Sequence, residues 1–192
     1  LDKFLQILED GRMTDSQGNT VYFTETIIIF TSNLGIYTLG ENGQREANVT
    51  SEMPYSEMSI RVREAIEDYF KLQLGRPEIL NRIGENIVVF DYIRPDVATL
   101  ILNTQIEKII RNLAVDKHIT VTIASDVMVL LNAQALKNLS NGGRGIGNVV
   151  ESMLINPLSR YLFDHELLEN VNIQVDALDL DSLPPSLQCT RG

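Results

Sequence analysis

The chain has little of what disulfide, metal and membrane proteins need. Its one cysteine, Cys189, cannot form a disulfide within the chain, which favours a reducing compartment. It has two histidines, His118 and His165, and no CxxC or HExxH spacing, so we expect no metal site. No apolar run approaches the roughly 18 residues that span a bilayer, and no secretory signal is visible, so we expect a cytoplasmic protein without membrane contacts.

Positive charge is also scarce. Sixteen Lys and Arg against 26 Asp and Glu give a net charge of −10 and a pI of about 4.6. Nucleic-acid binding usually requires a basic face that neutralises phosphates, so we expect no nucleic acid as a partner. A nucleotide needs only one or two well-placed cations and remains compatible with this charge. Hydrophobic content is 44%, which is ordinary for one or two small globular domains.

The first part of the chain predicts an α/β layer. Apolar spacing predicts a helix over residues 1–8 that ends at Gly11, and turn-forming residues between apolar pairs predict a hairpin over residues 12–23. The continuous β-branched run of residues 26–31 is typical of a strand buried on both faces, as in a parallel sheet. Residues 34–59 indicate a long irregular loop.

Two helices and a strand complete this layer. A helix is predicted over residues 59–74, and a shorter one begins at Pro77, a favoured first-turn position. Residues 87–90 predict a second apolar strand. The buried side of the longer helix is expected to comprise Ile60, Ala65, Ile66, Tyr69 and Phe70.

A second unit is predicted from about Arg94. It starts with an amphipathic helix over residues 95–116 that turns Val97, Leu100, Ile101, Ile109, Ile110 and Leu113 inward. A strand over residues 119–123 and a helix capped by Ser125 follow. After a Gly-rich segment comes an apolar helix that Pro157 is expected to bend, formed by Ile146, Val149, Val150, Met153, Leu154, Leu158, Tyr161 and Leu162.

The chain is expected to end with a strand over residues 171–175 and a flexible tail from Ser182. The predicted organisation is a partial α/β core over residues 1–93, a small α+β domain over residues 94–181 and a tail over residues 182–192.

Four motifs, in order, resemble those of the ClpB/Clp-type AAA+ ATPases. Residues 5–15 resemble L-Q-x-L-[DE]-D-G-R-[LM]-T-D, and residues 31–35 resemble T-S-N-[LI]-G. Residues 76–83 resemble R-P-E-F-[LI]-N-R-[IL], and residues 143–145 resemble the G-[AG]-R-[GP] opening of a lid helix. The chain is similar to the C-terminal part of the second ATPase module of ClpB-type disaggregases.

The resemblance implies a partial AAA+ core followed by a C-terminal lid domain. The phosphate loop, G-x-x-x-x-G-K-[ST], and the acidic Walker B strand do not occur in the sequence. We therefore expect a piece of a longer chain that does not hydrolyse ATP alone and binds no nucleotide tightly, with ATP and Mg²⁺ used by the full-length protein. Gly84 and Glu85 depart from the family pattern by what looks like a one-residue insertion.

The resemblance assigns Asn33 as sensor 1, which orients the attacking water, with Thr31 and Ser32 in support. From the residues alone, Asn33 also suits a turn. The resemblance makes Arg82 the arginine finger that acts on a neighbouring subunit, since guanidinium suits the charge of phosphoryl transfer. The alternative for Arg82 is a surface residue at a helix C-terminus. Arg76 is a second candidate for the finger, but because it precedes Pro77 it is expected to anchor structure.

Arg144 lies at a predicted helix N-terminus, where the helix dipole disfavours a cation. A bound phosphate compensates this, and neighbouring glycines allow close approach. The resemblance assigns Arg144 as sensor 2, with Gly143 beside it in the nucleotide site. The alternative is a flexible loop with an incidental arginine.

Related ATPases carry a hairpin near a central pore. By resemblance, Arg12, Asp15 and Tyr22 of the predicted hairpin line this pore and meet substrate polypeptide. A plain solvent-facing hairpin is the alternative, and the sequence does not separate the two.

The expected function is part of an ATP-dependent, hexameric chaperone of the stress response that threads unfolded or aggregated polypeptide, with a possible co-chaperone. One alternative is the unfoldase subunit of a Clp-type protease. Such subunits carry an [ILV]-G-[FL] tripeptide after sensor 1, whereas this chain has Leu39-Gly40-Glu41 there. Another alternative is a non-enzymatic interaction module.

Overall fold

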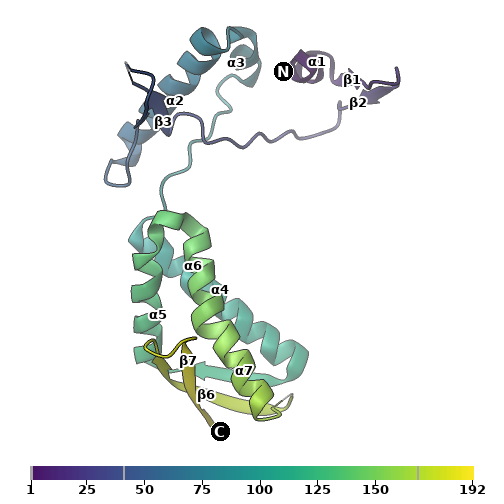
Figure 1. Ribbon diagram of the computed structural model, residues 1–192. Coiled ribbons are helices and arrows are strands. Elements are labelled where there is room, and N and C mark those ends of the chain that lie inside the picture. The colour runs from purple at the N-terminus through teal and green to yellow at the C-terminus, as the bar shows by residue number, and fades with distance from the viewer. Residues whose placement is uncertain (1, 41, 168) are drawn as a thin grey trace. The chain divides into compact units, whose positions relative to one another are not determined.

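The computed structural model describes residues 2–40, 42–167 and 169–192, with side chains from Phe4 onward (Figure 1). Leu1 and Glu41, which the sequence analysis names, lie outside the described residues. The chain divides into two compact units, Leu1–Asp91 and Tyr92–Gly192. Each unit has its own buried residues and is described by itself.

The first unit begins with a helix and a hairpin. Helix α1 spans Asp2–Asp10 and ends where Gly11, at φ +63°, donates its N–H to the carbonyl of Ile7 at 3.0 Å. Strands β1 (Arg12–Thr14) and β2 (Thr20–Tyr22) pair antiparallel. The predicted helix, its glycine stop and the hairpin are confirmed.

The segment predicted as an irregular loop contains regular structure. Strands β3 (Tyr37–Leu39) and β4 (Arg45–Ala47) form a second antiparallel hairpin. Helix α2 (Tyr55–Asp68) then starts four residues before the predicted start. The side of α2 that is buried carries Met58 and Val62, whereas Ile60 is exposed, so the predicted buried side was wrong at that position.

Two predicted strands are absent from the described residues. Residues 26–31 and 87–90 form no strand, and Figure 1 draws the stretch between β2 and β3 as coil. Ile27 is 92% exposed and Phe90 is 85% exposed. Both predictions are wrong for a physical reason: a strand exists only through hydrogen bonds to a neighbour, and no neighbouring strand lies beside these residues in the described part of the chain.

The first unit ends with two short helical segments. A π-helical segment, η1 (Tyr69–Gln73), extends α2, and α3 (Pro77–Ile83) begins with proline as predicted. The buried apolar side chains of this unit are few, which limits its hydrophobic stabilisation. They are Val49, Met58, Val62, Ile79 and Val89.

The second unit opens with α4 (Pro95–Lys117), β5 (Ile119–Ile123) and α5 (Ser125–Lys137), close to the predicted bounds. The inward face of α4 is confirmed in part. Ile101, Ile109, Ile110 and Leu113 pack against the core as predicted, but Val97 and Leu100 are exposed. The buried side chains are those of Ala98, Leu102 and Ile106. Helix α5 is also capped differently, because the cap position is Ala124 and Ser125 makes no capping hydrogen bond.

A long helical stretch follows the short 3₁₀ turn η2 (Leu139–Asn141). It consists of α6 (Gly142–Val150), the π-helical segment η3 (Glu151–Ile155) and α7 (Asn156–Asp164), whose first turn holds Pro157. The predicted apolar stripe is confirmed, since its members are buried in the core of the unit or packed against that core.

The sheet of the second unit has the order β5-β6-β7 (Figure 1). Strand β6 (Val171–Asp179) pairs parallel with β5 and antiparallel with β7 (Ser186–Arg191). A flexible tail was the wrong prediction for residues 186–191, because β7 has a full hydrogen-bonding partner in β6. The mixed α/β class is confirmed, with the parallel pair in this unit.

Candidate functional site

Asn33 is exposed and opens a tight turn. Its carbonyl accepts the N–H of Ile36 at 3.4 Å, and the Oγ of Ser32 accepts the N–H of Leu34 at 3.0 Å. Gly35, at φ +84°, supplies the left-handed conformation that the turn requires. The side-chain amide of Asn33 is therefore carried on an ordered turn, and the reading of Asn33 as a turn residue and its reading as a sensor are compatible.

The turn that follows Asn33 is seated against helix α2. A Cβ atom added to Gly35 would lie 2.8 Å from the carbonyl oxygen of Val62. The side-chain nitrogen of Asn48 donates to the carbonyl of Gly35 at 2.8 Å. Asn48 has no motif around it, and only the folded structure reveals its role in the turn.

Arg82 lies in the last turn of α3, where a cation complements the helix dipole. Its Nη2 lies 3.1 Å from the Oε1 of Glu9 in α1, and both side chains are about half exposed. Glu9 was not predicted from the sequence to be a functional residue. Arg76, the expected structural anchor, donates its N–H to the carbonyl of Phe70 at 2.8 Å and pairs with Glu78 at 3.3 Å.

Arg144 is the third residue of α6 and is exposed. No hydrogen bond or ion pair engages its guanidinium within the described part of the chain, so it has no internal counter-charge at this helix N-terminus. Gly143 is exposed, and a Cβ there would meet the Cδ1 of Ile93 only at an ordinary 3.6 Å. By contrast, a Cβ at Gly145 would lie 2.2 Å from the carbonyl oxygen of Asn138. Gly145 therefore fixes how closely α6 approaches the end of α5.

The first hairpin brings Arg12 and Tyr22 together as cross-strand partners. Tyr22 is 66% exposed, and Arg12 lies 3.8 Å from a carboxylate oxygen of Asp10. Asp15 has a different role, because its carboxylate accepts hydrogen bonds from the backbone of Gln17 and from the backbone and side chain of Asn19. These bonds, the Asn19 side chain first, lower the pKa of Asp15 and make it an organiser of the turn.

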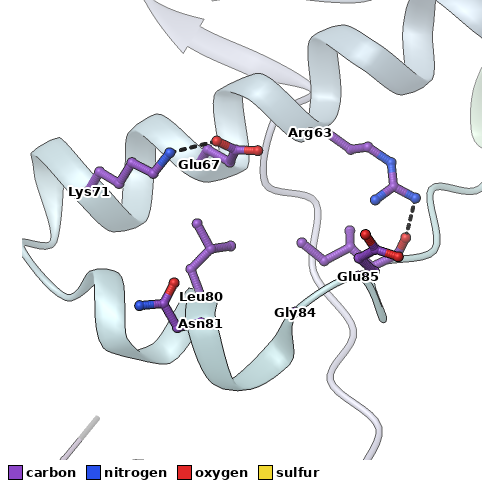
Figure 2. Close-up of a pocket in the computed structure, with 8 residues that line it drawn as sticks. Arg63, Glu67, Lys71, Leu80, Asn81, Gly84 and Glu85 are labelled. Carbon is purple, nitrogen blue, oxygen red and sulfur yellow. Dashed lines mark hydrogen bonds and ion pairs between the residues drawn. The ribbon is translucent and has the colours of Figure 1, made fainter.

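An open cavity of about 400 Å³ lies between α2 and α3 (Figure 2). Lys71 of η1 pairs with Glu67 of α2 at 2.7 Å, and the guanidinium of Arg63 donates to the carbonyl of Ile87. Asn81, next to Arg82 in sequence, also lines the cavity. Lys71, Glu67 and Arg63 are thus engaged with each other or with backbone, so the cavity by itself defines no ligand.

The candidate residues suit phosphate better than metal. An amide and guanidinium groups are hydrogen-bond donors for phosphate oxygens. Within residues 4–40, 42–167 and 169–192, no three His, Cys, Asp or Glu side chains gather closely enough to hold a metal ion. No helix of the same described residues has the length and apolarity to cross a membrane. Among the described residues of the first unit, no hydrogen bond or ion pair joins Asn33 to Arg82.

Comparison with known proteins identifies the family. Residues 1–86 match the sequence model of the AAA domain (Cdc48 subfamily). The chaperone protein ClpB 1 of Thermosynechococcus vestitus is 36% identical over 174 residues, which cover 90% of this chain and 18% of that protein. The ClpB of Gloeobacter violaceus is 33% identical over 172 residues, with the same two coverages. An ATP-dependent Clp protease ATP-binding subunit ClpA homolog of Cyanidium caldarium is 32% identical over 177 residues, 90% of this chain and 20% of that protein.

The chain thus belongs to the AAA+ ATPases, as the mixed α/β fold and the four motifs indicate. Its sequence corresponds to part of a ClpB/Clp-type module, because the similarity to ClpB chaperones extends over nine tenths of the chain. The chain spans about a fifth of the length of the curated relatives that it matches.

Proposed function

We propose that this chain is part of an ATP-driven protein-remodelling chaperone of the ClpB disaggregase type. The observation that carries the proposal is the similarity to ClpB chaperones across 90% of the chain. In the full-length protein, ATP with Mg²⁺ supplies the phosphoanhydride whose hydrolysis drives the threading of unfolded or aggregated polypeptide. The assembly is a homohexamer in the cytoplasm, open to a co-chaperone and active in the stress response.

Within this assembly, residues 1–93 contribute the end of the large AAA+ subdomain and residues 94–181 contribute the lid. Asn33 is sensor 1, and its exposed amide orients the attacking water. Arg82 is the finger that neutralises charge at a neighbouring subunit's phosphate. Arg144, with Gly143 beside it, is sensor 2; its exposure at a helix N-terminus without an internal counter-charge supports this role. Arg12 and Tyr22 contact the polypeptide at the pore, while Asp15 shapes their hairpin.

The test is the Arg82→Ala variant of the full-length protein. Removal of a trans-acting guanidinium is expected to lower ATP turnover by about 10³-fold or more while nucleotide binding stays within about twofold. Arg45→Ala, which removes another exposed guanidinium of the first unit that lies 4.9 Å from the centre of the Tyr37 ring, serves as the matched control and is expected to retain most of the turnover. Full turnover by Arg82→Ala contradicts the finger assignment.

A second candidate function is the ATP-binding unfoldase subunit of a Clp-type protease. It is favoured by the ClpA homolog of Cyanidium caldarium, which matches 90% of this chain. The [ILV]-G-[FL] tripeptide that protease-associated subunits carry after sensor 1 does not occur in this sequence, and its place is taken by the hairpin β3–β4. This favours the chaperone function instead. Degradation of a labelled substrate by the full-length protein with a ClpP-like peptidase decides between the two. Disaggregation without degradation is the expected result.

A further inference from the structure

The side chain of Asn48 connects the turn after Asn33 to helix α2 by hydrogen bonds. The Nδ2 of Asn48 donates to the carbonyl of Gly35 at 2.8 Å and to the carbonyl of Arg61 at 3.2 Å. The backbone N–H of Asn48 donates to the carbonyl of Ile36 at 3.0 Å. Its carbonyl in turn accepts from the Nη1 of Arg61 at 3.5 Å. Asn48 therefore joins two segments that each lie thirteen residues away in the chain.

The turn itself contains little that fixes its position. Its closing bond, from Ile36 to Asn33, is long at 3.4 Å, and the bond between Ser32 and Leu34 is local. Gly35 is buried against α2 without room for a side chain, since an added Cβ would also lie 3.1 Å from the Cα of Val62. Contact with α2 and the bonds of Asn48 thus set where the turn lies.

We propose that Asn48 is a positioning residue for Asn33 in the hydrolysis of ATP. Asn48 bonds the Gly35 carbonyl to α2 and so fixes the position of Asn33, two residues earlier in the chain. From this position the Asn33 amide contacts the attacking water. The inference rests on the proposed ATPase function. Gly35 has no side chain that could bond to α2. The side-chain amide of the distant Asn48 makes this connection instead.

The geometry also specifies the chemistry required at position 48. Two carbonyl oxygens converge on Nδ2, and only a group with two N–H donors on a short stem satisfies both. Aspartate has nearly the same shape but presents oxygen to both carbonyls. Alanine removes the group altogether. Both substitutions release the turn, although in chemically different ways.

The experiment is a double-mutant cycle in the full-length protein, with single-turnover hydrolysis of ATP and nucleotide affinity as the two measurements. Asn48→Ala and Asn48→Asp are each expected to slow hydrolysis by about tenfold or more, because a displacement of about 1 Å of a catalytic group reduces rates on this scale. Nucleotide affinity is expected to stay within about twofold. The combined Asn33→Ala and Asn48→Ala variant is expected to be no slower than Asn33→Ala alone.

The matched control is Asn86→Ala, which removes an amide of the same unit that makes one local bond to the carbonyl of Ile83 at 3.1 Å. It is expected to keep the parent rate of hydrolysis. Additive losses in the double variant overturn the inference, as do equal losses of binding and hydrolysis in both Asn48 variants. If Asn33→Ala itself hydrolyses at the parent rate, the sensor role in the proposed function fails. If only the Asn48 variants keep the parent rate, the positioning role alone fails.

Discussion

The carboxylate of Glu9 lies 3.1 Å from the guanidinium of Arg82, although the two residues are 73 positions apart in the chain. The pair joins helix α1 to helix α3 within the first unit. An arginine finger acts on a phosphate outside its own chain. In the proposed role of Arg82 as the finger, that phosphate competes with the carboxylate of Glu9, which already pairs with Nη2 of Arg82.

The first prediction concerns this competition. Glu9→Gln removes the competing negative charge while keeping the length of the side chain. Because half-exposed ion pairs contribute about 1 kcal/mol or less, we expect at most about a fivefold increase in ATP turnover by the full-length protein and little change in melting temperature. Steady-state hydrolysis at subsaturating ATP is the measurement.

Glu78→Gln is the control for Glu9→Gln. It breaks the pair between Glu78 and Arg76, at 3.3 Å and similar exposure, without touching Arg82. We expect turnover at the parent level. A fall in turnover for Glu9→Gln alone means that Glu9 supports Arg82 instead of competing for it.

The second prediction compares two glycines of α6. Gly145→Ala places a Cβ 2.2 Å from the carbonyl of Asn138, whereas a Cβ at Gly147 meets nothing within 4 Å. Both changes gain helix propensity, worth about 0.5–1 kcal/mol, so their difference isolates the clash. We expect Gly145→Ala to destabilise the second unit by about 1–3 kcal/mol and Gly147→Ala to stabilise it slightly.

Urea unfolding of the 192-residue chain, followed by circular dichroism, measures both variants of α6. Equal stabilities for Gly145→Ala and Gly147→Ala contradict the close approach of α6 to Asn138.

The third prediction concerns Cys189 in β7. Burial, and secondly the charge of Asp176, raise the pKa of the Cys189 thiol from 9.0 to about 11. The thiolate is the reactive form, so at pH 8 its fraction is about 100-fold lower than in the unfolded chain. We expect iodoacetamide to label Cys189 slowly in the folded chain and rapidly in denaturant. Equal rates contradict the packing of β7.

The same shift has a defined effect on stability. The folded state holds the thiol proton more tightly than the unfolded state does. The contribution of Cys189 to the free energy of unfolding is therefore complete below pH 9 and declines as the pH rises toward 11. Cys189→Ser, whose hydroxyl does not titrate in this range, is expected to remove that part of the alkaline destabilisation.

Local signals in the sequence were sufficient to predict many of the secondary-structure elements. The first hairpin is predicted because Asp15 and Gly18 supply turn chemistry between two short apolar segments, and the structure uses both: the Asp15 carboxylate caps the turn, and Gly18 has φ +89°. The start of α3 follows from Pro77 in the same way. In each case the residue that specifies the structure lies within the element itself.

The buried face of α4 was harder to predict because the helix is apolar on more than one side. Val97 and Leu100 fit an amphipathic pattern as well as Ala98 and Leu102 do, but the structure buries only the latter pair. The neighbours that select one face, α5, α6 and β5, are themselves products of folding. Helical periodicity narrows the choice of face without deciding it.

Pairing between distant segments could not be predicted from local pattern. Residues 26–31 have strong strand composition and remain unpaired, whereas residues 186–191, which follow two prolines and look like a tail, form a strand. The candidate site shows the same limit. Motifs indicated Asn33, Arg82 and Arg144. Glu9 lies within one of these motifs, but its pairing with Arg82 becomes visible only through the fold. The bonds of Asn48 to the turn after Asn33 have no sequence signature at all.

The parallel pairing of β5 with β6 has a consequence for biosynthesis. About fifty residues, including α5, α6 and α7, separate the two strands, and β7 adds to β6 only later in the chain. When a ribosome has synthesised α4 and β5, the strand has no neighbouring strand, and the inward face of α4 is still uncovered. Such contacts between distant segments form slowly, so this unit completes its core only after β6 and β7 have been synthesised and depends until then on protection from aggregation.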